Sequence, residues 1–266
     1  MSDLTTSSGV PVIEMRAVNV CALKSPGTTV AVNLDWTVNA GDFWVLAGAQ
    51  RAGKSDLLML AAGLMSPRCG TYRLFGESMP DFAEENLAER LRLGFVFDGG
   101  QLFSRLTLAE NVALPLKYHR DWSRETIESR VTALLEVTGL LPYAHLTPGN
   151  VGRNWQKRAG LARALALEPD VLLLDNPLAG LDARHTHWWL RFLDRLAGGQ
   201  HASTDKPLTL VVTTDDLSRP GLWRSRAKQI ACLAGGRLTV FRDWAELEMC
   251  HNAAVQELLT APPAGN

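Results

Sequence analysis

The sequence contains no long hydrophobic run: none of its apolar segments approaches the ~20 residues that a membrane-spanning helix needs. Residues 1–9 are polar, which predicts that the chain carries no signal peptide. Neither sign of charge is in excess, and the formal net charge of −1 argues against a nucleic-acid partner. Only four cysteines are present, far apart and without C-x-x-C spacing. These absences argue against a disulfide framework and a cysteine zinc site, and they favour a reducing cytosolic compartment.

The composition of the 266 residues is typical of a folded soluble protein, with 46% apolar and 21% charged residues. Short apolar runs alternate with stretches of helical periodicity. Because parallel strands need crossover connections, this pattern predicts an α/β fold with a mainly parallel sheet and an N-terminal antiparallel β part. Strands are predicted at residues 12–20, 30–38, 43–47, 72–75, 94–97, 171–174, 208–213, 229–233 and 237–241. Helices are predicted at residues 107–116, 123–138, 155–167, 184–197 and 244–259.

The domain organisation follows from the distribution of these elements. Residues 107–167 hold three predicted helices and no convincing strand, which indicates a helical insertion into the sheet domain. We expect a disordered N-terminus at residues 1–10 and a main domain at 11–243. Within it, the helical subdomain covers about 98–167, and a C-terminal helix and tail follow at 244–266.

A glycine-rich loop is the most specific motif of the sequence. The eight residues GAQRAGKS fit G-x-x-x-x-G-K-[ST] and stand between a predicted strand and a predicted helix, as a phosphate-binding loop requires. Glycines let backbone N–H groups face a phosphate, the lysine reaches the β and γ phosphates, and the serine can bind Mg²⁺. The motif therefore predicts a P-loop NTPase (RecA-like) fold. The predicted nucleotide-binding residues are Gly48, Ala49, Gln50, Arg51, Ala52, Gly53, Lys54 and Ser55.

A second element of such a site is the apolar strand that ends in Asp175. A carboxylate at the end of a buried strand can bind the Mg²⁺ that the loop serine also holds. The predicted metal ligands are thus Ser55 and Asp175.

With these motifs in place, the chain resembles the ATP-binding subunit of an ABC transporter from about residue 12 to residue 259. The resemblance depends on residues 161–175 (LARALALEPDVLLLD), on Pro177 and on residues 180–182 (GLD). Residues 102–116 look like the segment after the Q-loop, and this segment together with the ending VQELL is most similar to ATPases of lipid-asymmetry (Mce-associated) transporters. The resemblance implies ATP and Mg²⁺ as cofactors, an integral-membrane permease and a second ATP-binding subunit (homo- or heterodimer) as partners. It also implies a place on the cytoplasmic face of the inner membrane.

Several residues differ from the family's pattern at the positions that take part in ATP hydrolysis. Asn176 stands where the family has its catalytic glutamate, Asp98 at the Q-loop glutamine, and Asp215 at the switch histidine. A neutral amide cannot accept the proton of the attacking water, and loss of a positioned base typically costs about 10²–10⁴ in rate. The signature loop is also degenerate, and side chains at two of its glycine positions are expected to hinder a closed dimer. Its residues are Val151, Gly152, Arg153, Asn154 and Trp155.

Nucleotide affinity is expected to be weak for two reasons. Asp56 follows the loop serine, where a carboxylate would repel phosphate. The aromatic residue that stacks on adenine in the family is absent near residues 21–23 (CAL).

The leading hypothesis is therefore an ABC-type subunit, of a lipid or hydrophobic-compound system, that hydrolyses ATP poorly or not at all. One alternative is an active ATPase in which Asp98 or Asp215 serves as the base. A further alternative is a cytosolic P-loop scaffold or kinase without a membrane partner. Residues 184–195, which interleave arginines and aromatics, are expected to form a solvated helix face.

Overall fold

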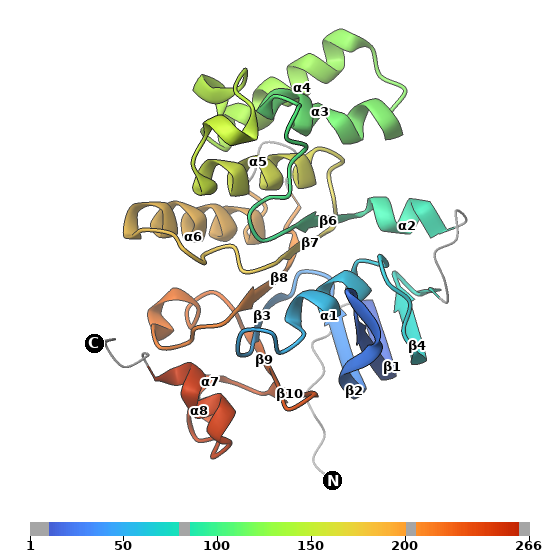
Figure 1. The fold of residues 1–266 in the computed structure, drawn as a ribbon, viewed down its shortest axis with the longest axis vertical. Coiled ribbons are helices and arrows are strands. Elements are labelled where there is room, and N and C mark those ends of the chain that lie inside the picture. The colour runs from blue at the N-terminus through green and yellow to red at the C-terminus, as the bar shows by residue number, and fades with distance from the viewer. Residues whose placement is uncertain (1–10, 80–85, 201–205, 261–266) are drawn as a thin grey trace. The chain divides into compact units, whose positions relative to one another are not determined.

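The computed structural model describes residues 11–79, 86–200 and 206–260 (Figure 1). The expected disordered N-terminus and the tail after residue 260 lie outside these ranges. The chain divides into two compact units. Among the described residues, the first comprises 11–79, 86–90, 209–211 and 215–260, and the second 91–200, 206–208 and 212–214. Across the residues described, no helix combines the length and the apolar character needed to cross a bilayer.

An antiparallel sheet forms the N-terminal part of the first unit, as the sequence predicts. Its strands follow the order β2-β1-β4-β5. Alternate residues of β1, such as Ile13 and Met15, are fully buried, because successive side chains of a strand point to opposite faces. The strand β2 starts earlier than expected, since its pairing with β1 continues to Ala22 opposite Ser25. The bounds are β1 Pro11–Ala22, β2 Ser25–Asn39, β4 Cys69–Leu74 and β5 Glu77–Ser78.

The first unit also contains the strand β3 (Phe43–Ala47), which is buried along its whole length. It pairs in parallel with β9 (Gln229–Ala234), and β10 (Arg237–Phe241) follows β9 in antiparallel pairing. The helix α1 (Lys54–Ala61) begins after β3, and the short helix η4 (Pro220–Leu222) precedes β9.

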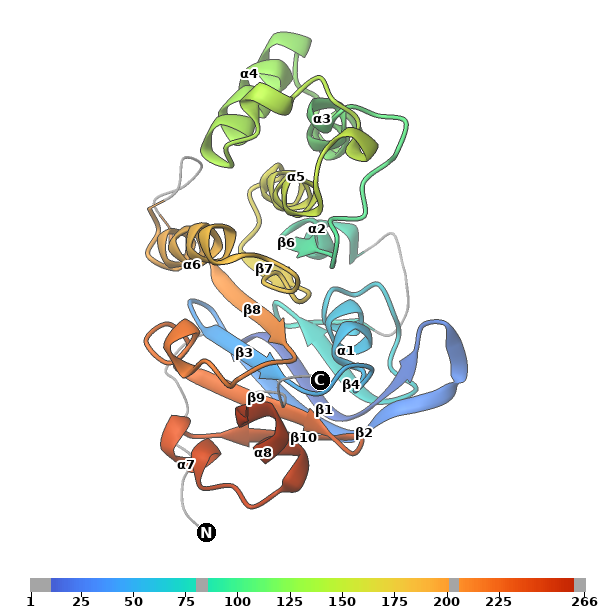
Figure 2. The same ribbon diagram turned by 60° about the vertical axis from the view of Figure 1, so that its left-hand side comes forward.

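The C-terminal segment is two short helices, so the prediction of one helix over residues 244–259 is wrong. They are α7 (Trp244–Glu248) and α8 (Ala253–Leu259), which lie beside β10 and β9 (Figure 2). The break occurs because Asn252 caps α8, its side chain accepting a hydrogen bond from the Ala254 N–H. The Gln256 side chain donates to the Cys250 carbonyl at 2.6 Å and holds the turn between the helices.

The second unit contains the helical insertion predicted for residues 107–167. Three helices, α3, α4 and α5, pack against one another there (Figure 1), and no strand interrupts this fully described stretch. Thr107 forms a capping box with Glu110 at the start of α3, and Ser123 caps α4. The parallel strands β6 and β7 pair with each other. The bounds are β6 Leu93–Val96, α3 Leu108–His119, α4 Arg124–Val137, η2 Leu141–Tyr143, η3 Pro148–Asn150, α5 Arg153–Leu165, β7 Val171–Leu174 and α6 Ala183–Ala197.

Two further elements span the division between the units. The helix α2 (Leu87–Leu91) lies where the chain passes from the first unit to the second. The strand β8 (Thr209–Thr214) contributes its first three residues to the first unit and its last three to the second.

Candidate nucleotide-binding site

The predicted phosphate loop, residues 48–55, connects β3 to α1 in the first unit. Gly53 has φ of 96°, a left-handed conformation that favours glycine. A Cβ atom at Gly53 would lie 2.8 Å from the Cβ of Val30, and one at Gly48 would lie 2.7 Å from the Leu233 carbonyl oxygen. Both glycines are therefore required by the packing of the chain around the loop.

The lysine of the loop is folded against the loop backbone. Its Nζ donates to the carbonyl oxygens of Gly48 at 2.6 Å and Ala49 at 2.8 Å, and the residue is only 7% exposed. No side chain caps the first turn of α1, where Ser55 is exposed. A helix start, an ammonium group and a hydroxyl together suit a phosphate group and its Mg²⁺. The loop thus fits the nucleotide predicted for it.

Asp56 makes a contact that the sequence does not predict. Its Oδ1 accepts a hydrogen bond of 2.8 Å from the Leu23 backbone N–H, so this carboxylate fastens the β1–β2 hairpin to α1. Leu23 itself is 50% exposed. Asp56 and the segment 21–23, which the sequence marks as unfavourable for nucleotide binding, therefore contact each other. One oxygen of Asp56 is engaged by the hairpin.

In the second unit, Asp175 directly follows β7 and is buried. Its Oδ1 accepts a hydrogen bond of 2.9 Å from the Thr213 hydroxyl, whose oxygen accepts one of 2.8 Å from the Asn176 N–H. Asn176 has φ of 46°, a left-handed conformation that asparagine tolerates better than glutamate. This chain of hydrogen bonds fixes the backbone at Asn176, the residue predicted to stand in place of the family's catalytic glutamate.

Lys157 of α5 joins these elements, although no motif in the sequence marks this lysine. Its side chain is 2% exposed, and Nζ donates to the carbonyl oxygens of Asn176 at 3.0 Å and Ala179 at 2.9 Å. The same Nζ lies 3.1 Å from Oδ1 of Asp98 in an ion pair. Burial lowers the pKa of the Lys157 ammonium, and the Asp98 charge opposes that shift. Asp98 and Asn176 are thus brought together by one buried cation.

Residues 151–155, predicted to be a degenerate signature loop, lead into α5, whose N-cap is Gly152. Arg153 is exposed, as the expected obstruction requires. Asn154 does not project in that way, because it is buried and its Nδ2 lies 2.9 Å from Nδ1 of His185. Only the first of the two expected obstructions is therefore present on the surface of this unit. Trp155 packs on Tyr143, with ring centroids 4.7 Å apart.

Other predicted residues are divided between the units. Ser55 belongs to the first unit and Asp175 to the second, so their joint binding of Mg²⁺ stays a prediction. Asp215 follows β8 in the first unit and is half-buried.

Comparison with known proteins decides the family. A family model described as ABC transporter matches residues 31–179. The chain belongs to the ABC transporter family. It is an ATP-binding domain of that family, and the predicted P-loop NTPase fold is confirmed. The ATP-binding cassette MJ0796, solved as a dimer in a post-hydrolysis state with ADP and Pi, has a TM-score of 0.76 and 25% identity. That match covers 86% of this chain and 98% of the cassette.

The curated relatives are named as import proteins. The methionine import ATP-binding protein MetN 2 of Rhodococcus jostii is 32% identical over 242 residues, which cover 89% of this chain and 68% of the relative. The sulfate/thiosulfate import ATP-binding protein CysA of Mycolicibacterium paratuberculosis is 34% identical over 239 residues, covering 90% and 61%. These names give no support to the lipid-asymmetry subfamily expected from the sequence.

Proposed function

We propose that this chain is the ATP-binding subunit of an ABC transporter in which its own site hydrolyses ATP slowly or not at all. The observation that carries the proposal is the amide of Asn176 at the position of the family's catalytic glutamate. The residue's backbone is held by Lys157 and Thr213, so the neutral side chain extends from a fixed point. A positioned base typically contributes about 10²–10⁴ in rate, and this chain offers none at that point.

The ion pair between Lys157 and Asp98 argues against the alternative in which Asp98 is the base. Oδ1 of Asp98 lies 3.1 Å from the Lys157 Nζ, so this oxygen is already engaged by a buried cation. Asp98 is therefore better suited to holding Lys157 than to activating water.

Nucleotide binding would use the phosphate loop, with Lys54 and the start of α1 toward the phosphates and Ser55 toward Mg²⁺. ATP with Mg²⁺ supplies the phosphate-transfer chemistry of the family. We propose weak binding, because residues 21–23 provide no aromatic ring for stacking on the base.

The partners proposed are a membrane permease and a second ATP-binding subunit, at the cytoplasmic face of the inner membrane. The names of the relatives, which refer to import, and the dimeric cassette support this assembly. The same names favour a small polar nutrient as cargo over the lipid expected from the sequence.

The test measures Mg-ATP binding by calorimetry and phosphate release by the same purified protein, with Lys54→Ala as the control. We expect detectable binding that Lys54→Ala removes, and phosphate release no faster than that of the control. Release well above the Lys54→Ala background would refute the proposal. Its loss in Asp98→Asn but not in Asn176→Asp would identify Asp98 as the base instead.

A further inference from the structure

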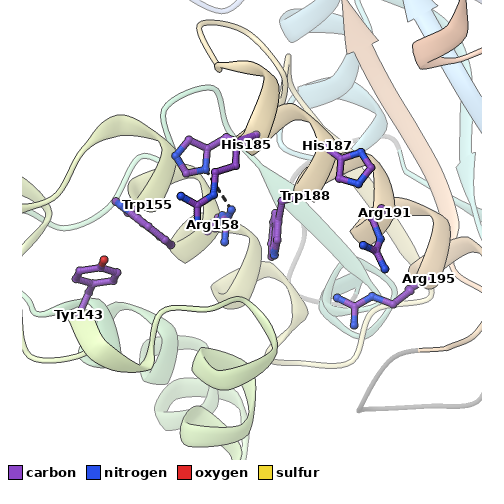
Figure 3. A pocket seen from close by; sticks show the side chains of 9 residues that line it. Tyr143, Trp155, Arg158, His185, His187, Trp188, Arg191 and Arg195 are labelled. Atoms are coloured by element: carbon purple, nitrogen blue, oxygen red, sulfur yellow. Dashed lines mark hydrogen bonds between the residues drawn. The ribbon is translucent and has the colours of Figure 1, made fainter.

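A basic pocket lies in the second unit, lined by residues of α5, α6 and the turn at η2 (Figure 3). Its volume is about 670 Å³, within the range of pockets that hold small ligands. Arginines and aromatic rings dominate the lining, and no carboxylate contributes to it. The side chains that matter here are Arg158, Arg184, Arg191, Arg195, Trp155 and Trp188.

Arg158 is the most buried of the four arginines, at 5% exposed. Its guanidinium carbon lies 3.5 Å from the ring centre of Trp188 and 4.7 Å from that of Trp155. The buried Nε has no hydrogen-bond partner. Burial, followed by the charge of Arg184, lowers the pKa of Arg158 to about 10. The guanidinium is thus held by the two rings, by a hydrogen bond of 3.3 Å from Nη1 to the Thr138 carbonyl oxygen and by the contact of Nη2 with Nδ1 of His185 at 3.3 Å, without a counter-charge.

The other three arginines extend along one face of α6. Arg184, Trp188, Arg191 and Arg195 follow spacings of four, three and four residues, which place them on one side of a helix. Within the described part of the chain, Arg184, Arg191 and Arg195 form no ion pair. All three are exposed, in agreement with the solvated helix face expected for this stretch, and they also line the pocket.

Two acidic residues lie near the pocket but do not line it. Asp182 caps α6 by accepting a hydrogen bond from the His185 N–H, and its Oδ2 lies 3.9 Å from Nε2 of His185. Asp194 is on α6 but does not line the pocket. Four guanidinium groups therefore share one cavity and lack an internal anion.

We propose that this pocket binds a small phosphate-bearing anion. Guanidinium groups form paired hydrogen bonds with phosphate oxygens, and several of them together suit a multiply charged group. The aromatic rings beside the guanidinium groups lower the local polarity and strengthen the attraction. A cavity of this size accepts a compact phosphate compound or a phosphate headgroup. The proposal does not depend on whether the chain hydrolyses ATP.

The experiment titrates inorganic pyrophosphate into Lys54→Ala protein, in which binding by the phosphate loop is impaired. We expect one site, which the further substitutions Arg184→Ala and Arg191→Ala weaken by at least about tenfold. The matched control carries Arg105→Ala and Arg124→Ala, two exposed arginines of the same unit outside the pocket, and should bind as before. Equal weakening in both double variants, or no binding, would overturn the proposal.

A second measurement uses the unmodified chain, in case Lys54→Ala does not fold. Hydrogen exchange with pyrophosphate should show protection at residues 155–158 and 184–195; protection confined to residues 48–55 would overturn the proposal. Separate titrations with AMP and with vesicles of phosphatidylglycerol in phosphatidylcholine distinguish a free phosphate compound from a lipid headgroup, and either result supports it. Binding of polyglutamate but of no phosphate compound would indicate a protein partner and contradict it.

Discussion

Replacement of Gly100 by alanine tests how the loop after β6 is held against α5. Gly100 has φ of 81°. A Cβ atom there would overlap the Gln156 carbonyl oxygen and lie 2.8 Å from the carbonyl carbon. From the other side, a Cβ at Gly160 would lie 2.8 Å from the Gly100 Cα. The two backbones touch, and this contact places Asp98 beside Lys157.

Two unfavourable contributions to the free energy of folding add when Gly100 is replaced by alanine. Alanine in the left-handed region costs about 1–2 kcal/mol, and an extra carbon in a packed interface costs about 1–3 kcal/mol. Gly100→Ala should therefore lower the free energy of unfolding by about 2–5 kcal/mol. Gly99→Ala is the matched control, because Gly99 has φ of 77° but its Cβ would meet only the Arg153 side chain at 3.7 Å. Gly99→Ala should lower the free energy of unfolding by about 1–2 kcal/mol, because only the backbone contribution applies to it.

The assay is urea unfolding of both variants and the parent chain, followed by circular dichroism and tryptophan fluorescence. Coincident transitions by both probes would justify comparing the free energies. Equal losses for Gly99→Ala and Gly100→Ala would refute the reasoning, because the packing contribution would then be absent.

Three further predictions concern single side chains. Lys157→Met should lower the free energy of unfolding by about 2–4 kcal/mol, since it leaves three backbone carbonyls without their donor. Lys117→Met on the exposed face of α3 should change it little by the same urea assay. Burial raises the pKa of the Cys232 thiol to about 12, so a thiol reagent at mildly alkaline pH should label exposed Cys69 in the folded chain and Cys232 only on unfolding, as peptide mapping would show. A hydrogen bond from a backbone N–H lowers the pKa of Asp182, so its contribution to stability is present at neutral pH and is lost as pH falls through that lowered value. Thermal unfolding of Asp182→Asn should accordingly show a smaller loss on acidification, and an unchanged pH profile would contradict this assignment.

The local elements of the fold were predictable because their signals are local. The strand at residues 171–174 and the strand at residues 43–47 have the predicted bounds, since each is a short apolar run that is buried on both faces. The C-terminal segment was less predictable. Its apolar spacing continues across residues 249–252, and only the capping by Asn252 shows where one helix stops and the next starts.

The functional site could be predicted only in part, because its decisive contacts join distant residues. The loop motif carries its own sequence signature, whereas Lys157 lies 59 positions from Asp98 and 19 from Asn176. A lysine within a helix gives no sign that its ammonium is buried among carbonyls. The hydrogen bond from the Leu23 N–H to Asp56 could not be predicted either, since it depends on where the β1–β2 hairpin contacts α1.

The packing around Gly48 and Gly53 has a consequence for how such motifs evolve. The Leu233 carbonyl and the Val30 side chain leave no room for a larger residue at either position, whatever the loop binds. Selection for a stable protein is then enough to preserve both glycines after selection for turnover has relaxed. A family member can therefore lose its enzymatic activity and still display an unbroken glycine signature, which makes that signature a record of architecture more than of chemistry.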